Sequence, residues 1–306
     1  MNLTQSVKSI QDDSNTHVRD WMLMLWRDKF AFVGAVFLSV VVFFAVVGPS
    51  VLPDSALDMN LMARNAPPFD LKQGWLYILG SDNLGRSLLA RLIVGARYTM
   101  MIAASAVLLG LMVGTVFGVI SGYAGGRVGN IILRSADVIM SFPSLLLALI
   151  VLFVLSPQVS NVVLVLALSR MPIYLRTCRA EVLEIRERQF VTAARAMGAS
   201  HTRMVFLHIL PNALPTLMTL ATLEFAAVML AESSLSFLGL GVQAPAVTWG
   251  LMVADGRGYL ATAWWVSFWP GLAISMTAIS ANLLANWLRT VMDPAQRWRL
   301  EGRKKS

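Results

Sequence analysis

The sequence predicts an all-α, polytopic membrane protein with six transmembrane helices. Of its 306 residues, 57% are hydrophobic and only 14% are charged, which is too apolar for a soluble domain. Several apolar stretches reach the roughly 20 residues that a helix needs to cross a bilayer. Backbone groups in lipid must be hydrogen-bonded within their own segment, so these stretches are expected to be helical.

The expected spans cover residues 30–52, 97–122, 131–155, 160–180, 212–238 and 264–289. Residues 1–29 form a polar segment without the pattern of a cleavable signal, so the first span is expected to stay in the chain. A segment at 53–96, rich in Pro, Asn and Asp, separates the first span from a five-helix core at 97–292, and a tail covers 293–306. An even number of spans places both termini on one side of the membrane.

Charge distribution gives the orientation. Nineteen of the 25 Lys and Arg residues fall on the side of the termini and of the 181–211 loop, whereas six fall on the side of the 53–96 segment. Short flanking segments with more Lys and Arg stay in the cytoplasm. Both termini and the 181–211 loop are therefore predicted to be cytoplasmic, and the 53–96 segment is predicted to be external.

Local patterns within the spans predict bends and side-chain pairs. Pro143, Pro172 and Pro270 lie inside or near span ends, where proline can bend a helix, as a hinge or as a static bend. Asp137 follows Arg134 by three residues, which favours an ion pair on one helix surface or an anchor at the membrane interface. An aromatic group begins the sixth span, because such rings favour the headgroup level; its members are Trp264, Trp265, Phe268 and Trp269.

Glycines recur every fourth residue in the second span, at Gly110, Gly114, Gly118 and Gly122. This spacing places them on one helix face, where the missing side chains let another helix approach closely. The partner helix can belong to this chain or to another subunit.

Two acidic residues, Glu224 and Glu232, fall in or at the end of the fifth span. A charge at membrane depth is costly unless it meets a partner or water, so both are candidates for lining a translocation path. For Glu232, which precedes two serines, hydrogen bonding that anchors the external turn is the alternative.

Several classes of function are excluded by missing motifs. The chain has no G-x-x-x-x-G-K-[ST] phosphate loop, no H-E-x-x-H and no G-x-S-x-G, so no catalytic, cofactor or metal site is expected. Its only cysteine, Cys178, allows no intrachain disulfide. His201 and His208 could share a helix face as a metal pair, but two histidines alone are a weak signal. The chain has a net charge of +8, but its basic residues are not interleaved with aromatic residues that could stack on bases. Nucleic acid is therefore not an expected partner.

The segment after the fourth span carries the most informative pattern. Thr192, Ala193, Ala194 and Met197 belong to a short helix with small residues that ends at Gly198, and Leu210–Pro211 opens the next helix. A short exposed helix of this kind suits docking into a groove of a partner. The segment resembles the E-A-A-x-x-x-G-x₉-I-x-L-P signature of binding-protein-dependent ATP-binding-cassette importer permeases. Here Thr192 replaces the glutamate and His208 the isoleucine.

A second resemblance covers about residues 30–294, and its most informative motif lies at residues 80–97. Its G-S-D-N-L-G-R-S stretch and the basic residues after it look like the external motif of C-type permeases of dipeptide, oligopeptide and nickel importers. The matching positions are Gly80, Asp82, Gly85, Arg86, Arg91 and Arg97. Their opposite charges can brace the loop itself or meet a docked protein.

These resemblances imply a type I importer permease fold in a bacterial inner membrane, in which residues 181–211 couple to the ATPase. They also imply four partners: a second related permease, two ATPase subunits that bind ATP and Mg²⁺, and an external substrate-binding protein. The expected solute is a peptide or peptide-like compound, with nickel as the alternative. An ion-coupled secondary transporter is the alternative from another class, but it would carry more polar midspan residues and paired broken helices.

Overall fold

The computed structural model describes residues 21, 23–52 and 55–292. This part of the chain contains helices and one isolated bridge between Ser81 and Ser87, but no strand. The elements are α2 (Lys29–Val51), η1 (Leu61–Ala63), η2 (Leu71–Gln73), η3 (Trp75–Leu79), α3 (Leu88–Ala124), α4 (Gly126–Met140), α5 (Ser144–Leu155), α6 (Val159–Ile185), α7 (Gln189–Ala196), α8 (His201–Arg203), η4 (Met204–Ile209), α9 (Leu210–Phe237), α10 (Trp249–Gly256), η5 (Arg257–Tyr259) and α11 (Trp265–Met292).

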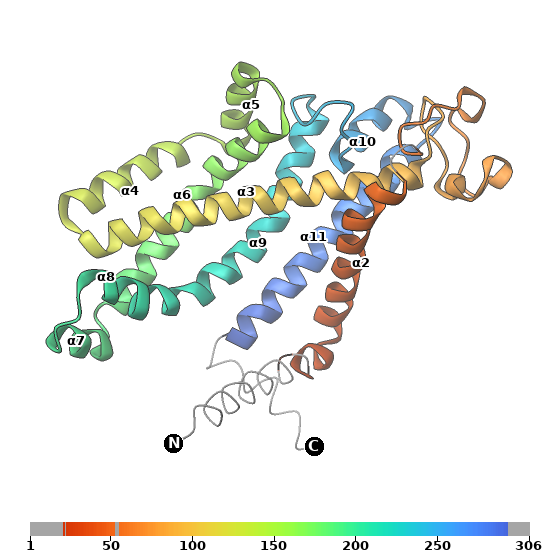
Figure 1. Cartoon of the computed structure of the whole chain (residues 1–306). Coiled ribbons are helices and arrows are strands. Elements are labelled where there is room, and N and C mark those ends of the chain that lie inside the picture. Colours follow the sequence, from red (N-terminus) through yellow and green to blue (C-terminus); the bar gives the residue numbers. More distant parts are fainter. Residues whose placement is uncertain (1–20, 22, 53–54, 293–306) are drawn as a thin grey trace.

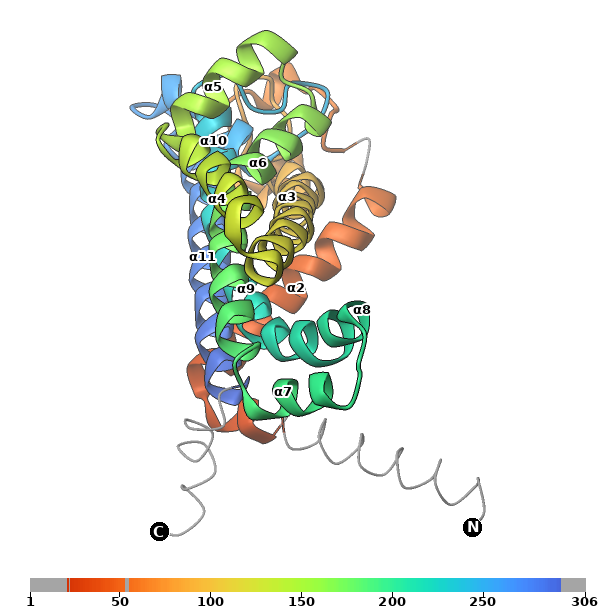
Figure 2. The same ribbon diagram turned by 90° about the vertical axis from the view of Figure 1, so that its left-hand side faces the viewer.

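The long helices form a bundle with distinct ends. In Figure 1, α3 runs obliquely across α9 and α11, from the 55–87 segment to α4. Figure 2 shows α7 and α8 together at one end of the bundle, while α5 and α10 lie at the other. Helix α2 begins, and helix α11 ends, toward the end of the bundle that carries α7. This agrees with an even number of crossings.

Five helices of the described residues are long and apolar enough to cross a membrane, and α4 with α5 would make a sixth. Four predicted spans match α2, α6, α9 and α11, although α6 extends five residues beyond the predicted end at 180. The all-α prediction is therefore confirmed. The predicted 293–306 tail and most of the 1–29 segment lie outside the described residues.

The second span begins earlier than predicted. Helix α3 starts at Leu88, nine residues before the expected position 97, and the hydroxyl of Ser87 caps it by accepting a hydrogen bond from the N–H of Ala90 at 3.2 Å. The loop prediction for 53–96 rested on Pro, Asn and Asp residues, but none of these lies in 88–96, where the helix begins. The loop segment therefore ends at Ser87.

The third span is broken. The predicted continuous helix at 131–155 is wrong: α4 and α5 meet at an angle of 85° across Ser141–Pro143. Proline has no N–H to donate and disfavours the helical conformation of the residue before it, so Pro143 ends the hydrogen-bond ladder here. By contrast, Pro172 and Pro270 lie inside α6 and α11, which continue past them.

The predicted pair of Arg134 with Asp137 is also wrong. Asp137 forms its ion pair with Arg176 of α6 instead. A spacing of three residues permits a contact along one helix, but here the neighbouring helix supplies a guanidinium that reaches the carboxylate.

The four glycines of α3 pack against α6 of the same chain. A Cβ added at Gly114 would lie 2.6 Å from Tyr174 Cβ and 2.8 Å from the carbonyl oxygen of Met171, and one at Gly118 would lie 2.6 Å from Cys178 Cβ. At Gly110 and Gly122 the nearest atoms belong to α6 as well, at 3.2 Å and 2.9 Å. Of the two alternatives for the glycine face, packing within the subunit is therefore the one that the structure shows.

Replacing Gly114 with leucine should push α3 and α6 apart, because a side chain at this position meets backbone as well as side-chain atoms. We expect a destabilisation of roughly 1–3 kcal/mol or more, seen as a lower thermal midpoint of the purified protein. Gly271→Leu in α11 is the matched control, since no atom lies within 4 Å of an added Cβ there. Equal stability of the two variants would contradict the packing role of Gly114.

Candidate functional site

The segment between α6 and α9 presents a short, exposed helix. Helix α7 ends where predicted, because Gly198 has φ +82°, a conformation that suits glycine and stops the helix. Thr192, Ala193 and Met197 are exposed, and Met197 retains 83% of its surface. These residues give α7 an outer face of small and flexible side chains.

The inner face of α7 holds the segment to the bundle. Val191 and Ala194 are buried, so Ala194 contributes to internal packing, unlike its predicted neighbours on the outer face. They share a core with residues of α6, η4 and α9: Tyr174, Cys178, Val182, Ile185, Met204, Ile209, Ala213 and Leu217. Leu210 and Pro211 open α9, as expected. Movement of α7 therefore requires movement of the adjoining parts of α6 and α9.

The G-S-D-N-L-G-R-S motif folds around Asp82, whose side chain is fully buried. Its carboxylate accepts hydrogen bonds from the backbone N–H groups of Leu84 and Arg86, both at 2.9 Å, and from Arg86 Nε at 2.7 Å. Arg91 Nη1 also pairs with it. Burial alone would raise the pKa of Asp82, but Arg91, Arg86 and the backbone N–H outweigh burial and lower the pKa below its ordinary value. Asp82 therefore remains a carboxylate well into acidic conditions.

Arg91 connects this cluster to a distant helix. Its Nη2 lies 3.2 Å from Asp255 Oδ2 in α10, and Arg86 Nη2 lies 3.9 Å from the same oxygen. Arg97 is exposed on α3 and takes no part in the cluster. The charges thus brace the loop, the start of α3 and α10 against one another, which is the self-bracing alternative. Asp255 was missed from the sequence because it lies 164 residues from Arg91 and outside any motif.

Gly80 and Gly85 allow the turn that carries Asp82. Both have positive φ, at +87° and +73°. A Cβ at Gly80 would lie 2.9 Å from the ring of Trp265, whose Nε1 donates to the carbonyl oxygen of Ser81 at 3.2 Å. Trp265 is only 8% exposed, so this member of the predicted aromatic group joins the loop to α11.

The two acidic residues of α9 have different surroundings. Glu232 is 1% exposed and accepts a hydrogen bond from the hydroxyl of Ser236 at 2.8 Å, so it is held within the last turns of α9. Glu224, near the middle of α9, forms an ion pair with Arg170 of α6 at 3.3 Å. The sequence analysis counted Arg170 among the cytoplasmic charges. Its place eleven positions into the span predicted at 160–180 was nevertheless a signal for an acidic partner on another helix, because a charge inside a span needs one.

No metal site is formed by the described residues. Among them, no three His, Cys, Asp or Glu side chains come together to hold an ion. His201 instead contacts the hydroxyl of Tyr123 at 2.7 Å through its Nδ1.

The Asp82 cluster should contribute substantially to the order of the 55–87 segment. Asp82→Asn would leave Arg91, which is 3% exposed, without its main counter-charge, and we expect a loss of about 3 kcal/mol in stability. The measurement is thermal unfolding with protease sensitivity of the 55–87 segment. Asp70→Asn is the control, because its pair with Lys72 spans 3.8 Å at an exposed position and should matter by less than about 1 kcal/mol. Similar effects of the two changes would contradict the bracing role.

The same cluster predicts how stability depends on pH. Because the pKa of Asp82 is lowered by folding, its contribution is fully present above the ordinary carboxyl range and is lost as pH falls through the lowered pKa. In wild type, protease resistance of the 55–87 segment should persist through mildly acidic pH and decline only in stronger acid. A decline that begins near neutral pH would contradict this assignment.

Comparisons with known proteins agree with this architecture. The family described as "Binding-protein-dependent transport system inner membrane component" matches residues 114–298, and the "N-terminal TM domain of oligopeptide transport permease C" matches residues 17–68. A solved structure, from a study of inward-facing conformations of the MetNI methionine ABC transporter, aligns with a TM-score of 0.55 over 66% of this chain and 96% of that chain. At 19% sequence identity, this likeness shows the fold alone.

Relatives with assigned names match over most of their length. The "Di/tripeptide transport system permease protein DppC" of Pseudomonas aeruginosa is 39% identical over 269 residues, covering 88% of this chain and 89% of that protein. The "Dipeptide transport system permease protein DppC" of Alkalihalophilus pseudofirmus is 34% identical, covering 92% of each chain. The "Probable D,D-dipeptide transport system permease protein DdpC" of Escherichia coli is 32% identical, covering 96% of this chain and 98% of that protein. The chain therefore belongs to the binding-protein-dependent transport permeases, as a multi-pass membrane subunit with the fold of an ATP-binding-cassette importer permease.

Proposed function

We propose that this permease subunit moves short peptides or peptide-like solutes into the cytoplasm, and that it has no enzymatic activity of its own. The observation that carries the proposal is the full-length similarity to permeases named for dipeptides and tripeptides, at 32–39% identity. Nickel complexes remain the alternative solute. An ion-coupled transporter is disfavoured by the family to which the chain belongs.

The partners follow from the same family. The proposed assembly contains a second related permease, two ATPase subunits that bind ATP and Mg²⁺, and an external substrate-binding protein. No nucleic acid is involved. We place both termini and α7 in the cytoplasm and the 55–87 segment outside, as the charge bias of the sequence requires.

Helix α7 is the proposed contact with an ATPase. Its outer face is small and exposed at Thr192 and Ala193, while Val191 and Ala194 hold it to α6 and α9. A docked helix of this kind would pass closure of the ATPases to the two helices behind it.

A transport assay tests the proposed function. The complex with its partner subunits is reconstituted in vesicles. It should transport a labelled dipeptide only when ATP is on the cytoplasmic side of the membrane and the binding protein is on the external side. Uptake of labelled nickel without dipeptide uptake would favour the nickel alternative. Dipeptide uptake driven by an ion gradient without ATP would contradict the importer proposal.

Substitutions on α7 test the coupling contact. Ala193→Glu adds volume and a charge to the outer face, and burying that charge in a partner groove should weaken ATPase association by at least about tenfold. Because Ala193 is exposed, the variant should fold and reach the membrane; Ala193→Ser, which stays small, is the control. Gly198 is less suitable, since any side chain there is strained by its φ of +82°. Normal ATPase association and normal uptake by the Ala193→Glu variant would show that α7 is not the contact with the ATPase.

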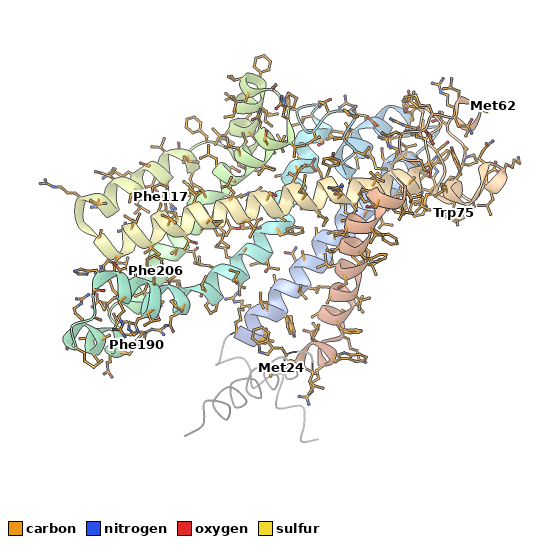
Figure 3. All side chains as sticks on the ribbon, in the orientation of Figure 1. Met24, Met62, Trp75, Phe117, Phe190 and Phe206 are labelled. Carbon is orange, nitrogen blue, oxygen red and sulfur yellow. The ribbon has the colours of Figure 1, made fainter. Side chains whose placement is uncertain are left out.

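Cysteine labelling tests the orientation. In a Cys178→Ala background, a cysteine at exposed Ser200, beside α8, should react with membrane-impermeant reagents only from the cytoplasmic side. A cysteine at Met62, which is 93% exposed and lies at the outer end of the loop in Figure 3, should react from outside. The reverse pattern would invert the proposed topology.

A further inference from the structure

The Arg170–Glu224 pair lies well inside two helices that are long and apolar enough to cross a membrane. Glu224 is fourteen residues from the first residue of α9 and thirteen from the last, so it lies about 20 Å from either end. Their side chains retain 20% and 13% of their surface, which means that the pair is shielded but not sealed. A charge pair at this depth is costly to desolvate, and apolar residues of similar size would often give an equally stable protein. Stability alone therefore gives a weak reason for this pair.

Part of the hydrogen-bonding capacity around the pair is unused. Arg170 Nε and the hydroxyl of Tyr174 are buried and have no hydrogen-bond partner among the described residues. Glu224 Oε2 lies 3.3 Å from Arg170 Nη1 in the ion pair but accepts no hydrogen bond. Tyr174 follows Arg170 by one helical turn of α6 and is fully buried. Buried polar atoms normally have partners, so these unsatisfied atoms in neighbouring side chains indicate that a polar molecule or water completes this place.

A pocket reaches Arg170, the basic member of the pair, from the break between α4 and α5. It has a volume of about 210 Å³, and its lining includes Phe142 and Ser144 at the break and Ser169 and Arg170 on α6. This is well above the roughly 10–15 Å³ that a water molecule needs. A helix break at membrane depth is tolerated where it is buried in protein or lines a water-filled cavity, and the Ser141–Pro143 break borders this pocket. The bend therefore opens a polar space next to Arg170.

From the pocket, the ion pair and its unsatisfied atoms, we infer that Arg170 and Glu224 form a charged station in the solute path that binds the two ionic ends of a zwitterionic peptide. The guanidinium matches a carboxylate in two parallel hydrogen bonds, and the Glu224 carboxylate matches an ammonium group. Between solutes the two side chains neutralise each other. The inference rests on the proposed peptide function and adds to it the residues that recognise the solute.

The station also lies on the helices that α7 would move. Arg170 belongs to α6 and Glu224 to α9, and these are the two helices whose cytoplasmic ends share a core with Val191 of α7. A change in the spacing of α6 and α9 at that end would alter the distance between the two charges. Opening the pair for the peptide is thereby linked to the state of the ATPases.

Double neutralisation tests the station without leaving one charge buried alone. In Arg170→Gln/Glu224→Gln, we expect normal complex yield and basal ATP hydrolysis but at least about a tenfold loss of ATP-driven dialanine uptake, because charge-assisted hydrogen bonds to the solute are removed. The matched control is Arg176→Gln/Asp137→Asn, which removes the other ion pair of α6, where both side chains are nearly half exposed. This control should assemble and transport normally.

The exchanged variant Arg170→Glu/Glu224→Arg provides a second measurement, since it keeps an ion pair but reverses its direction. Assembly with impaired uptake supports the station. Normal uptake by the neutralised variant or by the exchanged variant overturns it, as does failure of both to assemble, which would make the pair a structural contact. Absence of dialanine uptake by wild type would instead refute the peptide function itself.

Water access gives a readout that does not depend on uptake. In a Cys178→Ala background, Ser169→Cys in the pocket should react with a small cationic thiol reagent during ATP turnover, and dialanine should slow the reaction. Leu168→Cys, on the adjacent apolar face toward α3, should react at least about tenfold more slowly, because thiolate formation needs water. Equal rates at the two positions would show that no polar path reaches Arg170.

Discussion

The close contact between α3 and α6 is the constraint on which the arrangement of the bundle depends. Association of helices in lipid gains little from the hydrophobic effect, so close packing must supply much of the energy. The glycines of α3 let the backbone of α6 approach along more than three turns, from Gly110 to Gly122. This contact fixes the rotation of α6. With one face of α6 turned toward α3, Arg176 reaches α4 and Arg170 reaches α9.

Buried charge is used at two levels of the molecule, with different surroundings. In the 55–87 segment, Asp82 is enclosed by two arginines and two backbone N–H groups, so the hydrogen-bonding capacity of its carboxylate is filled and it acts as a brace. Between α6 and α9, Arg170 Nε and the hydroxyl of Tyr174 have no partner among the described residues, and Arg170 lines a pocket. Arg91 Nε also lacks a partner among these residues, so the pocket beside Arg170, and not the unpaired atom alone, separates the candidate binding place from the structural cluster.

The two core regions divide the bundle along its length. One joins α2, α3, α5, α10 and α11 to the parts of α6 and α9 far from α7, and it continues toward the ion cluster through Trp265. The other joins α7 and η4 to the parts of α6 and α9 near α7, with Leu111 of α3. Helix α5, which follows the break after α4, packs into the first region through Ala148 and Leu152. A displacement of α7 would therefore act first on the near parts of α6 and α9, while their far parts stay packed in the first region.

Local properties of the sequence determined much of this protein: apolar lengths predicted the helices, the four-residue glycine spacing predicted a close contact, and Gly198 predicted where α7 ends. These features depend on residues within a few turns of one another. The tertiary structure alone decided which residues meet across helices, because such contacts depend on the rotation and crossing of helices and not on spacing along the chain. It selected Arg170 for Glu224, Arg176 for Asp137 and Asp255 for Arg91. It also turned Ala194 inward and fixed the bend before α5 at 85°. A proline in a hydrophobic run shows where a helix can bend, but not by how much.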